Sequence, residues 1–329
     1  MKAKGCYIIL SIALLIFISA PSYAVETLRL GHHQAVNSMV DKTAKKFAEL
    51  VEEKTGGEVK VKVFPSAQLG GESQAYELLH QGGIDATITS MGYGDKYYPP
   101  LAATTLPFVF RDWDHAAKAM RGDFGKMLIK GLKDNSNIQM VGILEVGPRD
   151  MMFNRDPIQS LSGLKGVKMR SPEQFIWIRM FELLGAKPTP IPWGEVYTTL
   201  QTGVVAGLDT PAQQAIDMKF YEVTNSLVKT GHIFLFMSIN VNKNKIAKLK
   251  PEYQAAIESA GREAAIWSNE TIIKPGVAAA YSVLEAKGIK VVAADDIDKW
   301  AEAVRPLWNE IGEKYEGAGE AIKALRAIK

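Results

Sequence analysis

The spacing of apolar residues changes repeatedly along the chain, and the changes predict alternating strands and helices. Residues 59–64 alternate apolar and polar side chains, which is typical of a half-buried strand, and residues 26–30 predict another short strand. Between them, apolar residues recur at the spacing of one helical face: Val40, Ala44, Phe47 and Val51. Asn37 or Ser38 can cap this helix. This alternation predicts an α/β protein with a largely parallel sheet.

The same alternation continues through the rest of the chain. Further strands are predicted over residues 84–89, 138–144, 151–154, 167–169, 187–191, 207–209 and 232–241. Further helices are predicted over residues 72–80, 114–135 with an interruption near Gly122, 173–184, 195–202, 211–219 and 251–268, the last able to continue past Pro275. Gly147 and Pro148 predict a break. The strand over 232–241 is long enough to cross between two lobes, which predicts a hinged clamshell with its binding site in the cleft.

The first 24 residues have a different pattern from the rest. Lys2 and Lys4 precede an almost wholly apolar stretch over 6–18, and small residues stand at Ser22 and Ala24. A basic head, a short apolar body and a small-residue tail predict a secretory signal that is cleaved after Ala24. The alternative is a membrane anchor, but the apolar stretch falls short of the roughly 20 residues that a spanning helix needs.

Composition and charge exclude several classes of protein. Hydrophobic residues make up 47% and charged residues 23% of the 329 residues, which excludes a disordered chain or a disulfide scaffold. Lys and Arg number 39 against 36 Asp and Glu, without a long basic run, so no nucleic-acid partner is expected. Cleavage after Ala24 removes two lysines and the only cysteine, Cys6. The mature chain therefore has a net charge of +1 and no thiol for a disulfide or a zinc site.

The motifs of common enzymes are missing from the sequence. It contains no G-x-S-x-G elbow, no H-E-x-x-H pair and no P-loop lysine motif. His32 and His33 are adjacent, but neighbouring residues on a strand point to opposite faces and make a poor chelate. We therefore expect no metal, no cofactor and no catalytic residues, and a protein that is not an enzyme.

Arg170 is the first candidate for ligand binding. It follows the strand predicted over 167–169, and Ser171 can cap the next helix with Pro172 at its first position. A guanidinium there, beside a helix N-terminus, suits a carboxylate, which arginine binds through two parallel hydrogen bonds. The position is equally compatible with an exposed surface arginine. Arg149, after the predicted break, is a second candidate on the same grounds.

Trp193 is the second kind of candidate. Pro190 and Pro192 restrict the loop that places Trp193 just before a predicted helix. A tryptophan in a rigid loop can form a flat apolar wall for a ligand. From the residues alone, packing in the core is the slightly favoured alternative.

Several blocks of sequence resemble the solute-binding subunits of TRAP transporters, the DctP-type family. These blocks are residues 65–72, 163–172, 184–191, 193–205, 220–223 and 230–232, in the order and spacing of the family. The resemblance implies an α/β fold, a two-lobed periplasmic binding protein clamshell of the type II-like kind, with lobes joined by crossing strands and a long helix. Lobe I would comprise residues 25–146 plus about 236–275, and lobe II residues 147–235 plus about 276–329.

The resemblance also implies a function. The protein would capture an organic acid through its carboxylate in the periplasm and deliver it to the TRAP membrane subunits. The alternative is a periplasmic ligand-sensing protein that presents a carboxylate ligand to a membrane receptor. The family's carboxylate-binding arginine falls on Arg170, its helper on Arg149 and the bulky wall on Trp193. First-lobe contacts fall on four further residues: His33, Gln34, Glu72 and Ser90.

The sequence departs from the family pattern at one block. Many members have a glutamate and an asparagine where this chain has Asp209 and Thr210 before Pro211. Ser90 stands where sialic-acid-type members have an acid. We expect Asp209, Thr210 and Ser90 to adjust recognition of the ligand beyond its carboxylate, which favours a smaller or less hydroxylated acid than a sialic acid.

Overall fold

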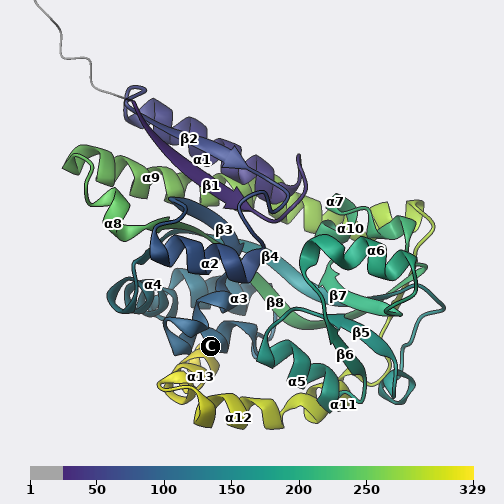
Figure 1. Cartoon of the computed structure of the whole chain (residues 1–329). Helices are drawn as coiled ribbons and strands as arrows, with labels where there is room; N and C mark the ends of the chain where they lie inside the picture. Colours follow the sequence, from purple (N-terminus) through teal and green to yellow (C-terminus); the bar gives the residue numbers. More distant parts are fainter. Residues whose placement is uncertain (1–24) are drawn as a thin grey trace, which may run out of the picture.

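The computed structural model describes residues 25–329, so the signal predicted over 1–24 lies outside the described residues. Within them, one mixed sheet runs in the order β2-β1-β3-β8-β4-β7-β5-β6, with β9 paired to β8 (Figure 1). The strands are β1 (Glu26–His32), β2 (Val59–Phe64), β3 (Ala86–Ser90), β4 (Ile138–Phe153), β5 (Lys168–Ser171), β6 (Lys187–Pro190), β7 (Gly207–Pro211), β8 (Ser226–Asn242) and β9 (Lys290–Ala293).

Two long strands, β4 and β8, join the two ends of the sheet. They run antiparallel from Ile138 paired with Asn242 to Phe153 paired with Ser226. On its other side β8 pairs with β3, and β4 pairs with β7. The parallel pairs β1–β2 and β1–β3 lie at one end of the sheet, and β5–β6 and β5–β7 at the other (Figure 1). Crossing strands between two α/β units are therefore confirmed, although the sheet is mixed and not largely parallel.

The break predicted at residues 147–148 is wrong, because β4 continues through both. Its pairing with β8 is irregular between Glu145 and Gly147 and again between Arg149 and Met151. Gly147 has a φ of 107°, a backbone conformation that favours glycine. Such a bulge bends and twists a strand without ending it. The strands predicted on either side are therefore two parts of β4.

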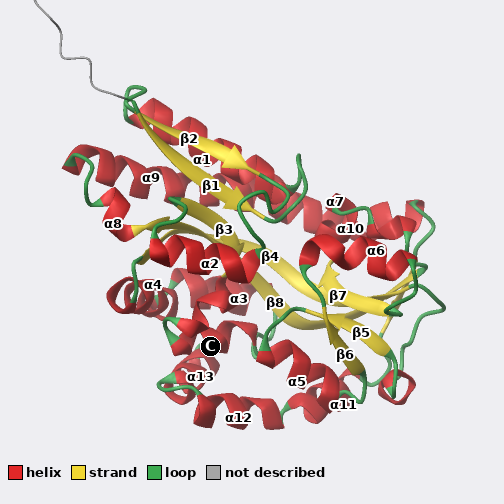
Figure 2. Ribbon diagram, viewed as in Figure 1, coloured by secondary structure: helices red, strands yellow, loops and turns green. Residues whose placement is uncertain are grey.

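Helices cover both faces of the sheet (Figure 2). The α-helices are α1 (Met39–Lys54), α2 (Glu72–Gln81), α3 (Trp113–Arg121), α4 (Asp123–Asn135), α5 (Phe175–Leu183), α6 (Val196–Gln201), α7 (Ala212–Asp217), α8 (Lys243–Ile246), α9 (Pro251–Ser268), α10 (Lys274–Ala286), α11 (Ile297–Val304), α12 (Pro306–Lys314) and α13 (Ala318–Ala327). Short 3₁₀ helices are η1 (Met91–Lys96), η2 (Pro99–Thr105), η3 (Leu161–Leu164), η4 (Trp193–Glu195) and η5 (Phe220–Glu222).

The long helix predicted from residue 251 is present and links the two ends of the sheet. A single π-helical turn, η6 (Asn269–Ile273), connects α9 to α10 without a loop. Asn269 in this turn accepts a hydrogen bond from the backbone of Glu145 and donates one to the carbonyl of Ile143. Since α9 packs against α1 and α10 packs against α7, the helix spans both α/β units as expected.

Capping residues predict the ends of helices correctly where the same residue is not part of a strand. Ser38 caps α1 by accepting a hydrogen bond from the backbone of Asp41, and Gly122 separates α3 from α4, as predicted. The cap predicted at Ser171 is wrong, because α5 begins only at Phe175. Ser171 is instead the last residue of β5. Its carbonyl accepts a hydrogen bond from the backbone N–H of Ile191, the residue that follows β6.

Buried apolar residues form clusters on both faces of the sheet. One cluster joins α1 to α9, a second lies under α6, α7 and α10, and a third extends from α4 through α5 to the last three helices. In that third cluster α12 packs against α5, whereas α13 packs against η2 and α4. Within residues 25–329, no helix has both the length and the apolar character needed to cross a membrane.

Candidate functional site

A small cavity of about 10 Å³, the room of roughly one water molecule, lies where the two α/β units meet. Residues from both units line it: His33, Gln34, Glu72, Ser90, Tyr93, Arg149, Arg170, Pro172, Trp177, Trp193, Gln214 and Leu235. Several of them stand at or just beyond the carboxyl ends of the parallel strands β1, β3 and β5. Ligand sites of open α/β sheets lie at such strand ends, so the cavity is in the predicted place.

Arg170 is buried at the end of β5, with only 2% of its surface exposed. Its Nε donates a hydrogen bond to the carbonyl of Ile191 (3.0 Å), and its guanidinium lies 5.4 Å from the ring centre of Trp193. No carboxylate of residues 25–329 lies within ion-pair distance of it. Burial lowers the pKa of Arg170 from its ordinary value. A buried guanidinium with free N–H groups and no anion has the chemistry to receive an acidic group.

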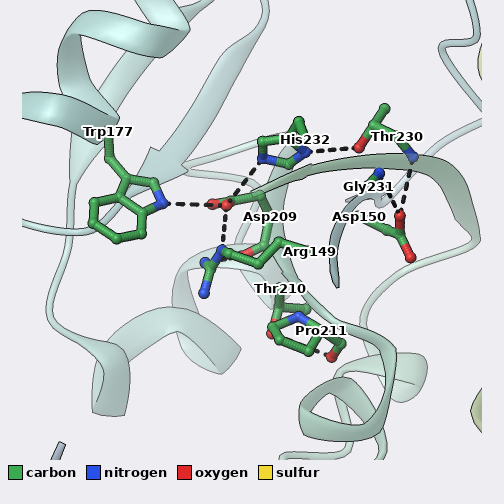
Figure 3. A network of polar contacts seen from close by, with 9 residues as sticks. All are labelled: Arg149, Asp150, Trp177, Asp209, Thr210, Pro211, Thr230, Gly231 and His232. Atoms are coloured by element: carbon green, nitrogen blue, oxygen red, sulfur yellow. Dashed lines mark hydrogen bonds and ion pairs between the residues drawn. The ribbon is translucent and has the colours of Figure 1, made fainter. Parts of the chain in front are cut away.

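Arg149, on β4, differs because it already has an acidic partner. Its Nε donates to Oδ2 of Asp209, and its Nη2 donates to the Asp209 carbonyl, each at 2.6 Å (Figure 3). Asp209 Oδ2 also lies 3.3 Å from Nε1 of Trp177 and from Nε2 of His232. Burial alone would raise the pKa of Asp209, but the Arg149 charge and the hydrogen bonds from His232 and Arg149 hold it far below its usual range.

A second set of contacts fixes the part of β8 behind this ion pair. Nδ1 of His232 lies 2.7 Å from the hydroxyl of Thr230, so His232 connects β8 to Asp209 on β7. The carboxylate of Asp150 accepts hydrogen bonds from the backbone of Thr230 and Gly231, each at 3.0 Å (Figure 3). These contacts hold Arg149 in one position at the back of the cavity.

The wall of the cavity formed by the first unit is centred on Glu72, at the start of α2. Its Oε1 accepts hydrogen bonds from the Ser90 backbone (3.0 Å) and hydroxyl (2.6 Å) and from the Thr89 hydroxyl (3.3 Å). Nε2 of His33 lies 3.5 Å from the same oxygen and 2.9 Å from the side-chain nitrogen of Gln34. Burial alone would raise the pKa of Glu72, but His33 and the Ser90 hydrogen bonds hold it below its ordinary value.

Trp193 satisfies both interpretations of its sequence position. Its ring meets His33 edge-on across the cavity, with centres 6.2 Å apart, and packs against Phe220 on its other side. It is 7% exposed, and its Nε1 has no hydrogen-bond partner among residues 25–329. The side chain is thus both part of the core and a wall of the cavity.

Five further residues line the cavity and were not predicted as site residues: Tyr93, Pro172, Trp177, Gln214 and Leu235. Tyr93 had a usable signal, since it follows a predicted strand and stands between two glycines. A Cβ on Gly92 would lie 2.3 Å from Thr105, and one on Gly94 would lie 2.6 Å from Leu101. Both glycines therefore let η1 pack closely on η2, and this packing presents Tyr93 to the cavity.

Asp209 and Thr210 are not among the residues that line the cavity. Both are fully buried, and the hydroxyl of Thr210 donates to the carbonyl of Pro211 (3.4 Å). Asp209 is connected to the cavity only through Arg149, to which it is bound.

Comparison with known proteins places the chain in a family. The family described as "Bacterial extracellular solute-binding protein, family 7" (DctP) matches residues 30–315. The sialic acid-binding periplasmic protein SiaP of Vibrio cholerae is 32% identical over 92% of this chain and 93% of its own length. The 2,3-diketo-L-gulonate-binding periplasmic protein YiaO of Escherichia coli is 31% identical over 100% of this chain and 99% of its own.

A solved structure shares the fold. A TRAP periplasmic solute-binding protein from Polaromonas, bound to D-erythronate, superposes with a TM-score of 0.87 at 28% identity, covering 92% of this chain and 99% of that one. The match over residues 30–315 and the two relatives above 30% identity agree with it. The chain belongs to the DctP family of bacterial extracellular solute-binding proteins, the periplasmic solute-binding proteins of TRAP transporters.

Proposed function

We propose that this protein binds an organic acid by placing its carboxylate on Arg170, and then delivers the acid to TRAP membrane subunits. The observation that carries the proposal is Arg170 itself, a buried cation without an anion at a cavity between two α/β units. Asp209 already neutralises Arg149. The unbalanced positive charge of this wall therefore belongs to Arg170, and one carboxylate neutralises it.

Relatives support an acidic ligand. The similar proteins described above bind sialic acid, 2,3-diketo-L-gulonate and D-erythronate. Each of these compounds has one carboxyl group together with hydroxyl groups. We carry only that common chemistry, a carboxylate with hydroxyls, over to this chain.

We propose that the two units open and close about β4 and β8. The cavity draws lining residues from both units, so a ligand contacts both only when they are closed. The irregular pairing near Gly147 and Arg149 lies where the crossing strands pass from one unit to the other. Ligand binding would shift the equilibrium toward the closed form. The lobes proposed are residues 25–146 with about 236–275, and 147–235 with about 276–329.

We propose that the acid leaves the site unchanged. Thr230, His232 and Asp209 have the residue types of a hydrolytic triad, and they are hydrogen-bonded in that order. All three are buried, however, and none is among the residues that line the cavity. The transport family to which the chain belongs supports a binding role.

Calorimetry with a panel of acids tests this function. The panel contains hydroxy acids, keto acids and aromatic acids, each with its methyl ester and its primary amide as neutral controls. We expect at least one acid to bind and to raise the melting temperature, since a ligand that binds only the folded state stabilises it. Its ester and amide should bind poorly. Equal binding of acid and ester, or binding of no acid, would contradict the proposal.

Trp193 should report binding by fluorescence. Because its ring faces the cavity, the acid found in the panel should change the tryptophan emission, and Trp193→Phe should remove most of that change. Trp267→Phe is the matched control, since Trp267 lies on α9 beside Lys46 and away from the cavity. A full response in Trp193→Phe, or a response lost in the control, would remove Trp193 from the binding wall.

Export can be tested by intact mass. We expect protein recovered from the periplasm to lack residues 1–24, because the predicted cleavage follows Ala24. Protein that retains Cys6 in its mature form would contradict cleavage and would support a membrane anchor.

A further inference from the structure

We propose that helices α12 and α13 move with the first unit, and that Arg179 and Glu310 form a clasp between the units that is made only when they close. The clasp slows the release of a bound acid. This inference rests on the opening and closing proposed above. It also transfers residues 306–329 from the second unit, where the sequence places them, to the first.

The cavity is too small for an acid unless the units part, because it has room for about one water molecule. A hollow of about 280 Å³ continues from it between α2 and the segment before α5, and shares four of its residues: Glu72, Tyr93, Arg170 and Trp193. A second hollow of about 200 Å³ lies between η1 and the start of α5 and reaches Tyr315, the residue after α12. The two units therefore face each other along these hollows, and α12 ends beside them.

Buried hydrogen bonds attach α12 and α13 to the first unit. Nε1 of Trp308, on α12, donates to the carbonyl of Pro107 (2.9 Å). Nε2 of His115, on α3, lies 3.2 Å from the carbonyl of Leu325 on α13. Helix α13 also packs against η2 and α4, and α12 extends from it toward α11 and the second unit (Figure 1). The last two helices are thus anchored at the end of the molecule opposite α11.

Helices α12 and α13 also pack closely on each other. A Cβ on Gly312 would lie 3.3 Å from the Cα of Gly319, so the lack of a side chain there lets the helices approach. Gly317, in the turn between them, has a φ of 73°, a conformation that favours glycine. We therefore treat α12 and α13 as a hairpin that moves as one body.

The hairpin contacts the second unit through more exposed groups. Nε and Nη2 of Arg179, on α5, donate to the two carboxylate oxygens of Glu310 on α12 (2.9 and 3.0 Å), in the paired geometry that suits arginine and a carboxylate. Nζ of Lys314 lies 3.6 Å from the ring centre of Phe175, at the start of α5. The side chains of Arg179 and Glu310 are 35% and 33% exposed. Water can therefore replace these contacts when α12 and α5 separate.

Opening has to break the contacts on one side of α12. Separation from the first unit would leave the buried indole N–H of Trp308 without its acceptor, which is costly. Separation from α5 returns two partly exposed charged groups to water, which costs little. We therefore infer that α12 parts from α5. Since α11 packs against α5, it stays with the second unit, and Pro306, which begins α12, marks the boundary.

A chemical link between α5 and α12 tests this assignment. The predicted mature chain has no cysteine, so Arg179→Cys with Glu310→Cys introduces the only two thiols. The probe is D-erythronate, or the tightest-binding acid of the panel where D-erythronate does not bind. After the acid has bound, a short bismaleimide joins the thiols, and tryptophan emission follows release. We expect release to become more than about tenfold slower, because the units can no longer part.

Two further pairs of cysteines are the controls. Glu77→Cys with Glu173→Cys joins the units directly across the larger hollow, and should slow release as well. Lys54→Cys with Glu263→Cys joins α1 to α9 inside the first unit, and should not.

The three links distinguish the possible failures. Release that is slowed across the hollow but not by the α5–α12 link would show that α12 moves with the second unit, and would overturn this inference alone. Release that neither of these links slows would overturn the opening and closing as well. Equal slowing by the link inside the first unit would contradict a specific role for the clasp.

Glu310→Gln tests whether the ion pair itself holds the units closed. The amide keeps the size of the side chain but removes the charge that Arg179 binds. By stopped-flow fluorescence with the same acid, we expect dissociation to become roughly two- to fivefold faster, the effect of losing a partly exposed ion pair, with little change in association. Glu263→Gln is the matched control, since its ion pair with Lys54 (2.8 Å) lies within the first unit. Unchanged dissociation in Glu310→Gln, or an equal change in the control, would contradict the clasp.

Discussion

Arg170→Lys will weaken binding of the acid roughly ten- to hundredfold. Lysine keeps the positive charge but lacks the planar fork that makes two parallel hydrogen bonds to one carboxylate. The loss corresponds to about 1.5–3 kcal/mol, the range for hydrogen bonds to charged groups. Arg170→Ala will weaken binding more, because the ligand carboxylate would then be buried without a partner. Calorimetry on the three proteins measures both changes.

The methyl ester of the same acid separates binding from folding. The ester lacks the charge that Arg170 recognises, so it should bind the wild type poorly and lose little more in the two variants. Acid and ester against wild type and variant form a double-mutant cycle, in which the coupling energy measures the carboxylate–Arg170 contact. Equal losses for acid and ester would show that Arg170 supports the fold, and Arg149 would then be the next candidate.

Asp209→Asn will destabilise the folded protein by about 3–5 kcal/mol, the usual loss when one partner of a buried ion pair is removed. Arg149 would remain buried with a neutral partner, and the contacts from Trp177 and His232 would lose the charge that strengthens them. Urea unfolding at pH 7 measures the loss. The double variant Arg149→Met with Asp209→Asn should recover part of it, because no unpaired charge is left.

The Arg149–Asp209 ion pair also predicts that the free energy of unfolding depends on pH. The pKa of Asp209 is far below its usual range in the folded protein, so its stabilising contribution is complete above the unfolded-state pKa of about 3.9 and declines as the pH falls below it. The stability difference between wild type and Asp209→Asn should therefore shrink on acidification below about pH 4. If the stability difference between wild type and Asp209→Asn is under about 1 kcal/mol at pH 7, or if it grows in acid, the ion pair is not stabilising.

The sequence predicted those parts of the fold that depend on local spacing. The cap at Ser38 and the interruption at Gly122 are decided by one residue and its neighbours, and both are confirmed. The break at Gly147 failed because glycine followed by proline is a turn signal in isolation, whereas β8 supplies a partner along the whole of β4. Ser171 failed as a cap because pairing between β5 and β6 fixes its backbone.

Part of the site was also predictable from the sequence, some of it from the residues alone and some from the family resemblance. Arg170 and Trp193 line the cavity because each lies next to a strand end that the sequence itself predicts. The positions of His33, Gln34, Glu72 and Ser90 came from the family resemblance, and all four line the cavity. Whether they contact a ligand stays a prediction.

The spacing of residues along the sequence could not predict which distant side chains contact one another. The Arg149–Asp209 ion pair joins residues 60 positions apart, and nothing in either segment indicates the other. Asp209 was expected to meet the body of the ligand, but its Oδ2 is bound to Arg149. Tyr93 was missed because its two glycines also suit an ordinary turn.

A crystal structure of the complex with the tightest-binding acid of the panel tests the carboxylate site most directly. We expect the two carboxylate oxygens to lie about 2.7–2.9 Å from nitrogens of Arg170, with the two units closed around the ligand. A carboxylate bound to Arg149 or to another residue, with Arg170 out of contact, would contradict the proposed mode of binding.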